Sequence, residues 1–215
     1  LAQYEWLLFI DADSKPKSAE YLSNYIKKIN NNYDAVFGGF AYDDKSQNGN
    51  KTLRYTFGKH REEVDEIIRN KNPYKVIISA NFLIKRVVFL KLNKPDTINI
   101  YGLDYLFSAQ LKKYSVSIKH INNEVYHLGL DSNDKFLKKT QNAVEALHYI
   151  NNSGKIKTHN ISLLRAYKLF KAIGLKQPLA WLFKKFESKI EANLKGTNPD
   201  LFLYDVYRLG YLCTL

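Results

Sequence analysis

The amino-acid sequence predicts an α/β domain with a mainly parallel sheet flanked by helices, followed by a C-terminal helical extension. Short continuous apolar runs of strand length are typical of strands covered on both faces. Such a run occurs at 6–10, and 34–40 and 75–84 are further expected strands. Segments with apolar residues at helical spacing alternate with them, as in sheets whose strands are connected by helices. After Asn152 only helical spacing remains, so we expect a domain over 1–152 and an extension over 153–215.

The elements are expected in the following order. A strand at 6–10 leads to a helix that Pro16 opens, with one apolar stripe at i, i+3, i+4 and i+7. The stripe consists of Leu22, Tyr25, Ile26 and Ile29. A strand at 34–40 ends in two glycines, and a polar loop follows at 43–52. The later elements are a charged helix at 59–71, a strand at 75–84 with a short helix after it, a helix from Asp104 to Tyr114, strands near 116–121 and 124–128, and a helix near 134–151.

The composition bounds the class of protein. The chain has 215 residues, of which 45% are hydrophobic and 25% charged, as in a globular protein with one sizeable domain. Cys213 is the single cysteine, which excludes an internal disulfide framework and fits a reducing compartment. We find neither a signal peptide nor an apolar run near the roughly 18–20 residues of a membrane span. We therefore expect a cytoplasmic protein.

The net charge of +12 is concentrated near the C-terminus, where residues 155–215 contain 11 Lys/Arg and 4 Asp/Glu. A helical stripe runs through this region, and lysines occupy the rest of the helix. The stripe consists of Leu179, Leu182, Phe183, Phe186, Ile190 and Leu194. Two interpretations remain open: the helix packs on the domain, or it lies as a basic amphipathic helix on the inner face of a membrane. Nucleic-acid binding is not expected, because we find no zinc cluster or RNA-binding motif.

Two carboxylates, Asp11 and Asp13, directly follow the apolar run at 6–10. Ligands of parallel α/β sheets bind beyond the carboxyl ends of the strands. Two carboxylates this close repel each other, and a divalent cation such as Mg²⁺ or Mn²⁺ offsets that repulsion through its preference for oxygen ligands. The alternative is an ordinary polar turn in which Asp13 or Ser14 caps a helix.

Two other classes of protein contain aspartates at this D-x-D spacing, and their further sequence requirements can be compared with this chain. A calcium-binding EF-hand loop starting at Asp11 requires glycine and glutamate where Pro16 and Leu22 stand. Phosphatases of the haloacid dehalogenase type resemble this start, but they have Thr or Val where Lys15 stands. Neither interpretation fits.

Two further features carry candidate chemistry. Gly102 permits a tight turn before a helix whose first turn contains Asp104, where the helix dipole favours the ionised carboxylate. Such a carboxylate can accept a proton from a hydroxyl group, or it can simply cap the helix. His127 lies at a strand end before Gly129, as either a metal ligand or a structural histidine.

In combination these features resemble family 2 glycosyltransferases of the GT-A fold over about residues 1–150. The resemblance implies that Asp13 is a direct metal ligand and that Asp11 contacts the nucleotide or a metal-bound water. It implies that His127 completes the metal site. It also implies that Asn81 and Gly102 lie in segments that bind the sugar donor.

The same resemblance implies the reaction. The family usually has Glu-Asp at the catalytic position, and here Leu103 replaces the Glu while Asp104 keeps the position of the catalytic base. The expected enzyme is a Mn²⁺- or Mg²⁺-dependent inverting glycosyltransferase. It would transfer a sugar from a nucleotide-diphosphate donor, expected to be a UDP-sugar, to a glycan or lipid-linked acceptor in bacterial cell-surface polysaccharide synthesis. Lys135, Lys138 and Lys139 are candidate contacts of the diphosphate.

Family members usually begin with a nucleotide-binding half well upstream of the D-x-D motif, whereas this chain begins almost on that strand. We therefore expect a truncated transferase region with weak or absent activity. Its exposed apolar sheet edges would favour a homodimer. The main alternative is a non-catalytic domain that acts as a membrane or protein interaction module. Metal-dependent UDP binding would distinguish the two.

Overall fold

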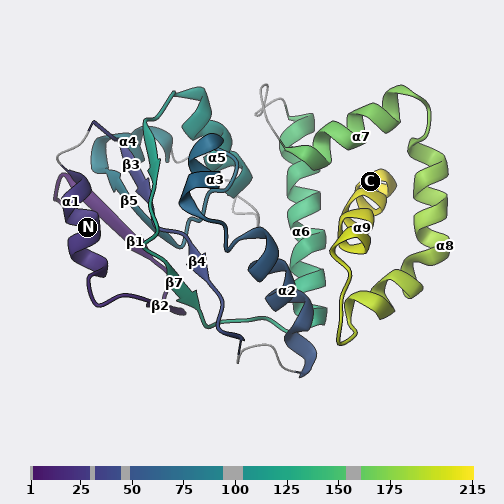
Figure 1. Ribbon diagram of the computed structural model, residues 1–215. Coiled ribbons are helices and arrows are strands. Elements are labelled where there is room, and N and C mark those ends of the chain that lie inside the picture. Colours follow the sequence, from purple (N-terminus) through teal and green to yellow (C-terminus); the bar gives the residue numbers. More distant parts are fainter. Residues whose placement is uncertain (1, 30–31, 45–48, 94–103, 154–160) are drawn as a thin grey trace. The chain divides into compact units, whose positions relative to one another are not determined.

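The computed structural model describes residues 2–29, 32–44, 49–93, 104–153 and 161–215, and for Asp104 and Tyr105 the backbone alone (Figure 1). The described chain is a mixed α/β structure that divides into two compact units. We call them the sheet unit and the helical unit. The sheet unit comprises Leu1–Ser46, Gly58–Ile98 and Phe107–Leu130, and the helical unit comprises Gln47–Phe57, Asn99–Leu106 and Asp131–Leu215.

The strands of the sheet unit form two small mixed sheets. The first has the order β1 (Trp6–Ile10), β5 (Asn81–Lys85), β3 (Ala35–Phe37), β6 (Ile118–His120). The second has the order β2 (Ser14–Pro16), β7 (Val125–His127), β4 (Phe40–Ala41). Strand β5 runs antiparallel to both β1 and β3, and β2 runs antiparallel to β7. The parallel pairs are β3–β6 and β4–β7.

The described strands therefore do not form the mainly parallel sheet that the sequence predicts. The difference arises at 75–84, which we expected to be strand throughout. Two turns reverse the chain there: the Lys75 N–H donates to the Asn72 carbonyl at 2.9 Å, and the Asn81 N–H donates to the Ile78 carbonyl at 3.3 Å. Only the part after these turns is strand β5, and it enters the sheet in the opposite direction. Alternation of strands and helices does not reveal such a reversal.

The core of the sheet unit lies on one face of the first sheet. Helices α4 (Arg86–Leu92) and α5 (Asp104–Lys113) contribute to it. Its buried members are Ala35, Phe37, Phe82, Ile84, Leu92, Leu111 and Val116. Phe37 and Phe82 stack at 5.2 Å between ring centroids. Since neighbouring residues of a strand point to opposite faces, Asn81 of β5 lies on the other face from Phe82.

Helix α1 (Tyr21–Ile29) buries a different stripe from the one predicted. Tyr21 and Tyr25 are buried, whereas Leu22 is 59% exposed and Ile26 is 62% exposed. The two tyrosine hydroxyls donate to the side chain of Asn81, at 2.8 and 2.7 Å. These bonds fix which side of α1 faces the sheet, so the stripe prediction was wrong for Leu22 and Ile26.

Two other predicted helix boundaries are also wrong. Pro16 ends edge strand β2, where its missing N–H costs little, and α1 begins only at Tyr21. The charged helix predicted at 59–71 is two helices, α2 (Thr52–Arg61) and α3 (Glu66–Lys71), preceded by the short 3₁₀ helix η2 (Gly49–Lys51). Asp65 causes the break because its side chain accepts from the Ile67 N–H at 2.8 Å and so caps α3.

Four long helices build most of the helical unit. They are α6 (Asn133–Asn152), α7 (Ser162–Ala172), α8 (Lys176–Leu194) and α9 (Leu201–Thr214). Helix α9 contacts the other three and lies between α6 and α8 (Figure 1). From the sequence we expected α6 in the first domain, because a polar segment follows residue 152. However, Val144 and Leu147 of α6 share a core with α7, α8 and α9. By packing, α6 therefore groups with the C-terminal helices.

None of the helices in the described ranges is both long and apolar enough to cross a membrane.

Candidate functional site

The D-x-D segment forms a tight turn at the end of β1. The Asp11 N–H donates to the Ala80 carbonyl at 3.1 Å, and the Ser14 N–H donates to the Asp11 carbonyl at 3.0 Å. The Asp13 carbonyl accepts from the Leu128 N–H at 2.9 Å. These backbone bonds fix the turn between β5 and the end of β7, so the strand ends place Asp13 beside His127.

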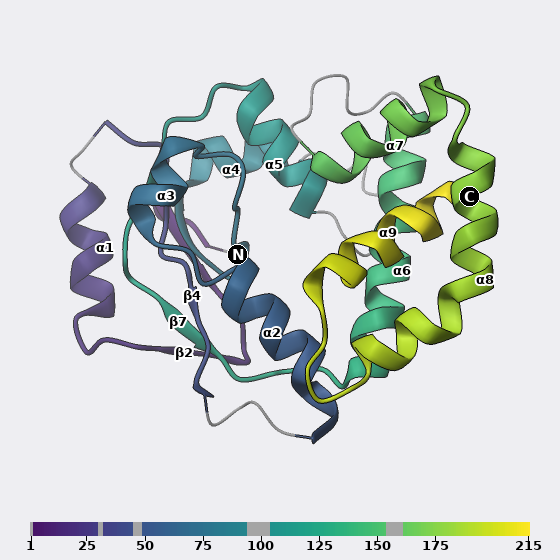
Figure 2. The ribbon, with the colours of Figure 1, turned by 45° about the vertical axis from the view of Figure 1, so that its right-hand side comes forward.

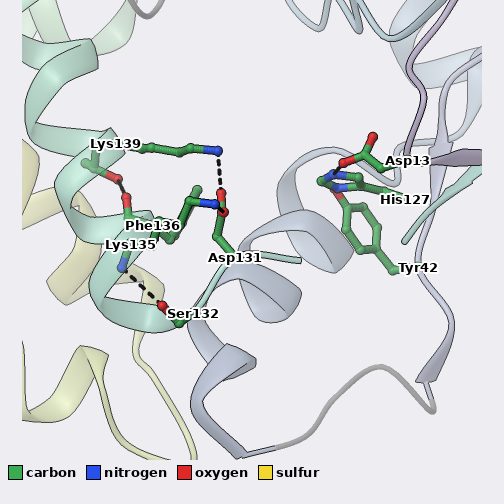
Figure 3. Close-up of polar contacts among 9 residues, drawn as sticks. Asp13, Tyr42, His127, Asp131, Ser132, Lys135, Phe136 and Lys139 are labelled. Carbon is green, nitrogen blue, oxygen red and sulfur yellow. Dashed lines mark hydrogen bonds and ion pairs between the residues drawn. The ribbon is translucent and has the colours of Figure 1, made fainter. Parts of the chain in front are cut away.

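Asp13 and His127 form the centre of the candidate site (Figure 3). His127 Nε2 lies 3.5 Å from Asp13 Oδ2, and the side chains are 13% and 48% exposed respectively. The pairing of Ser14 with His127 across β2 and β7 sets this distance. Gly129 lets the Asp13 carboxylate lie in this position, which a Cβ at residue 129 would overlap. The site is thus partly open, and both side chains can reach a ligand.

Tyr42 supports His127 from the other side. Its hydroxyl lies 3.4 Å from His127 Nδ1 and donates to a carboxylate oxygen of Glu62. The Phe40 ring stacks on the imidazole at 5.1 Å between centroids. Gly58 leaves space for the Tyr42 ring, which a Cβ would overlap. Residues from β4 and α2 therefore hold the orientation of the imidazole.

The two nitrogens of His127 face different groups. Nδ1 lies 3.4 Å from the hydroxyl of Tyr42, which donates to Glu62, and Nε2 lies 3.5 Å from Asp13 Oδ2. An imidazole nitrogen and a carboxylate oxygen, both ligand types of divalent cations, therefore face each other.

Carboxylate oxygen and imidazole nitrogen are both ligands of Mn²⁺, and Mg²⁺ also accepts carboxylate oxygen. The second contact from Tyr42 resembles the outer hydrogen bonds that orient metal-binding histidines. In the part of the chain that the structure describes, no three His, Cys, Asp or Glu side chains form a metal-binding group. A role for Asp11 at the metal or the nucleotide stays a prediction. The pair of Asp13 and His127 fits a cation whose other ligands are phosphate oxygens and water.

The side chain of Asn81 is enclosed by the protein and is not open to a ligand. It is fully buried, and its amide nitrogen donates to the carbonyls of Gly39 at 2.7 Å and Asn123 at 3.0 Å. Its oxygen accepts from Tyr21 and Tyr25, whose hydroxyl pKa values burial raises, to about 12 for Tyr21. All hydrogen-bonding positions of the side chain are occupied within the protein. A donor-binding role for Asn81 stays a prediction, and its side chain has no vacant position for it.

The predicted catalytic position falls at the edge of the described chain. Asp104 is the first residue of α5, but its side chain lies outside the described part, as do Gly102 and Leu103. Their roles stay predictions.

The lysines proposed to hold a diphosphate have partners in the helical unit. The Nζ atoms of Lys135 and Lys139 lie 2.7 and 2.6 Å from the two carboxylate oxygens of Asp131. Burial raises the pKa of Asp131, but its hydrogen bonds to the two lysines outweigh burial, so the pKa is lowered. Ser132 caps α6 and accepts from the Lys135 N–H (Figure 3). This arrangement stabilises the start of α6, and Lys138 is exposed.

Sequence reasoning missed Tyr42, Glu62 and Gly129. Phe40 and Tyr42 follow the two glycines at a spacing of two, which is the signal for a strand that places both on one face. Gly129 stands two residues after His127, and a glycine so close to a candidate ligand indicates close approach of another group. Glu62 has no sequence signal, because it reaches Tyr42 through the break between α2 and α3.

Comparison with protein-family models and with curated proteins finds no match to this chain. Function is therefore inferred from the motif order and from the geometry around Asp13 and His127.

Proposed function

We propose that this chain is the acceptor-side region of a metal-dependent inverting glycosyltransferase that uses a nucleotide-diphosphate sugar. The observation that carries the proposal is the pair Asp13–His127, with Gly129 leaving room for the carboxylate and Tyr42 orienting the imidazole. Its support is chemical, because the carboxylate oxygen and the imidazole nitrogen that face each other at 3.5 Å are both ligand types of divalent cations. The motif order around the pair supports the transferase class.

The site residues have separate roles in this proposal. Asp13 and the Nε2 of His127 would hold Mn²⁺ or Mg²⁺, and Tyr42, whose hydroxyl donates to Glu62, would orient the imidazole. The bound cation would neutralise the charge that develops on the diphosphate leaving group. The turn of backbone bonds around Asp11 keeps the two carboxylates in place before ligand binds, so less ordering is needed on binding.

Asp104 is the proposed base. Asp104 is the first residue of α5 and keeps the position that the resemblance assigns to the base. It takes the proton of an acceptor hydroxyl as that oxygen bonds to the anomeric carbon and the sugar leaves the diphosphate. A single displacement of this kind inverts the anomeric configuration.

The test is calorimetric titration of the chain with UDP in the presence of Mn²⁺ and, separately, of EDTA. We expect binding only with Mn²⁺, and Asp13→Asn and His127→Asn to weaken it by about tenfold or more. Asp134→Asn is the matched control, because its carboxylate is 79% exposed and pairs only with Lys195 among the ion pairs described for it. It should bind as the unaltered chain does.

UDP binding that is equal in EDTA, or no UDP binding, would contradict the proposal and favour the non-catalytic interaction module. Electron paramagnetic resonance of Mn²⁺ gives an independent measure of the metal. Free Mn²⁺ should decrease on addition of the chain, and less so with Asp13→Asn.

A further inference from the structure

Helix α8 has two chemically different sides. Its inner side packs on α9, where Phe183 meets Tyr207 at 5.5 Å between ring centroids and covers Gly210. The buried residues of the helix are Ala180, Phe183, Ile190 and Leu194. Their spacing of three, seven and four residues places them in one stripe. The rest of the helix is left for other contacts.

The acidic residues of α8 lie toward α9. Glu191 accepts from the Tyr207 hydroxyl at 3.2 Å, and its other oxygen lies 2.9 Å from Lys195. Burial raises the pKa of Tyr211 to about 12, and the negative charges of Glu145 and Glu187 contribute to that shift. Both glutamates of α8 are only partly exposed. The helix therefore directs its negative charge toward its own unit.

The outer side carries exposed apolar side chains and lysines with no acid among them. Trp181 is 63% exposed, Leu182 45% and Phe186 38%. Lys185 and Lys189 are exposed between them. Spacing of four residues aligns Trp181 with Lys185 and Lys189, and Leu182 with Phe186, as neighbours on one surface. We call these five residues the lysine–aromatic face.

The lysines of this face lie over its rings. Lys185 Nζ is 5.1 Å from the centroid of Trp181 and 5.8 Å from that of Phe186. Lys189 Nζ is 5.8 Å from the Phe186 centroid. The ammonium groups thus stay close to apolar surface, and their flexible stems allow them to extend to an anionic partner.

The chain that leads into α8 has the same character. Leu169 is 59% exposed, Ile173 56% and Leu175 41%. Lys168 and Lys171 are exposed among them. The end of α7 and the turn that follows it lead into α8 (Figure 2). Exposed apolar residues beside lysines therefore continue through them.

We propose that the lysine–aromatic face docks on an anionic lipid surface, whatever the activity of the sheet unit. Trp, Phe and Leu side chains enter the headgroup region of a bilayer, and lysines above them meet the lipid phosphates. The charge is complementary, since residues 155–215 contain 11 basic and 4 acidic residues. The contact is interfacial, because no helix in the described ranges can cross a membrane.

Composition favours lipid over protein as the partner. The centres of protein interfaces are depleted in lysine and enriched in arginine. This face has lysines at its centre, and residues 155–215 contain only two arginines, Arg165 and Arg208. Lysine with tryptophan is instead the typical combination of helices that lie on membranes.

The test is co-sedimentation of the full chain with vesicles of phosphatidylcholine alone and of phosphatidylcholine mixed with phosphatidylglycerol. We expect binding to the anionic vesicles only, weakening as salt is added. The double variant Lys185→Gln with Lys189→Gln should bind about 25-fold more weakly, roughly fivefold for each lysine. Lys27→Gln with Lys71→Gln removes the same charge from exposed lysines of the sheet unit and should bind nearly normally.

Fluorescence locates the contact. The chain has two tryptophans, so Trp6→Phe leaves Trp181 as the single reporter. Its emission should shift to the blue with anionic vesicles and stay unchanged with phosphatidylcholine. Trp181 and Phe186 are exposed, so Trp181→Gln and Phe186→Gln should weaken binding without changing the melting temperature.

Four results would overturn the proposal. They are equal binding to both kinds of vesicle, no binding to anionic vesicles, equal losses in the two lysine pairs, and no shift of Trp181 emission. A dimer in sedimentation equilibrium that Trp181→Gln dissociates would also overturn it, in favour of a second copy of the chain. Tighter binding to RNA than to vesicles would favour nucleic acid instead.

Discussion

Two histidines at the ends of consecutive strands in different sheets, His120 of β6 and His127 of β7, have opposite environments. His120 is fully buried, and both its nitrogens have partners: Nε2 donates to the Pro73 carbonyl at 2.8 Å and Nδ1 accepts from Arg69 at 3.0 Å. Burial lowers its pKa to about 4. His127 has one nitrogen held by Tyr42 and the other facing a half-exposed carboxylate.

The difference shows what separates a structural histidine from a candidate ligand. A structural histidine has both nitrogens committed to internal partners and stays neutral. A candidate ligand has one nitrogen oriented from behind and the other directed at an acidic group that a ligand can reach. Neighbouring sequence does not distinguish the two, since both residues end short β-strands.

The largest effect should come from Arg69, the buried partner of His120. Arg69 is 2% exposed, and its guanidinium donates to the carbonyls of Val64 at 2.7 Å and Ile121 at 2.8 Å, as well as to His120. We expect Arg69→Met to lower the free energy of unfolding by about 4 kcal/mol, because buried acceptors lose their donor. Urea denaturation measures this. Arg86→Met, at an exposed position, is the control, and an equal effect there would contradict the prediction.

Next in size is a pH dependence from His120. Its pKa is about 4 in the folded chain and about 6.5 unfolded, so between these values the unfolded state binds more protons. The free energy of unfolding should therefore decrease as the pH falls from 6.5 toward 4, by up to about 3 kcal/mol. Above pH 6.5 His120 is neutral in both the folded and the unfolded state, so its protonation no longer changes the free energy of unfolding.

Urea denaturation at neutral and acidic pH checks the effect. His120→Gln should show a smaller decrease on acidification than the unaltered chain. His127→Gln is the matched control and should keep the full decrease. If the free energy of unfolding decreased equally on acidification in the two variants, His120 would not be the source of the pH dependence.

A smaller effect is expected at Tyr42. Tyr42→Phe keeps the ring but removes the hydroxyl that contacts Glu62 and His127. If the proposed function holds, the affinity for UDP with Mn²⁺ should fall about tenfold, since outer contacts of metal-binding histidines have this size of effect. Calorimetry measures it. Tyr126→Phe, whose ring points to the other face of β7, should bind normally, and an equal loss there would count against the role of Tyr42.

The smallest effect is expected at Gly129. A Cβ there overlaps the Asp13 carboxylate, which would turn away at little cost in stability because it is half-exposed. Gly129→Ala should weaken Mn²⁺-dependent UDP binding about fivefold, equivalent to about 1 kcal/mol. In an Asp13→Ala background the same substitution should have no further effect. A loss that persists in that background would show that Gly129 acts elsewhere.

Local patterns in the sequence predicted most of the elements. The apolar run at 6–10 is strand β1, the helix expected from Asp104 is α5, and the helix expected near 134–151 is α6. Strand β1 forms because it pairs with β5 along its whole length, and α6 buries a regular stripe of apolar residues. At Leu22 and Ile26 polar contacts with a distant residue outweighed a local apolar pattern, and at Pro16 the pairing of β2 with β7 outweighed a local helix signal.

Candidate site residues were only partly predictable. Asp13 and His127 could be singled out from the residues that precede and follow them, and the structure brings them together. Tyr42 and Glu62 could not be joined to them, because their contact depends on β4 beside β7 and on the break between α2 and α3.

The sequence by itself determined the mixture of strands and helices, the position of the D-x-D turn after β1, and the basic character of the C-terminal helices. Those properties depend on residue type and on spacing along the chain. Only the tertiary structure decided the direction of β5, the neutral state of His120 and the nitrogen that His127 presents to Asp13. Each of these depends on hydrogen bonds and burial between residues far apart in the chain, which residue type and local spacing do not specify.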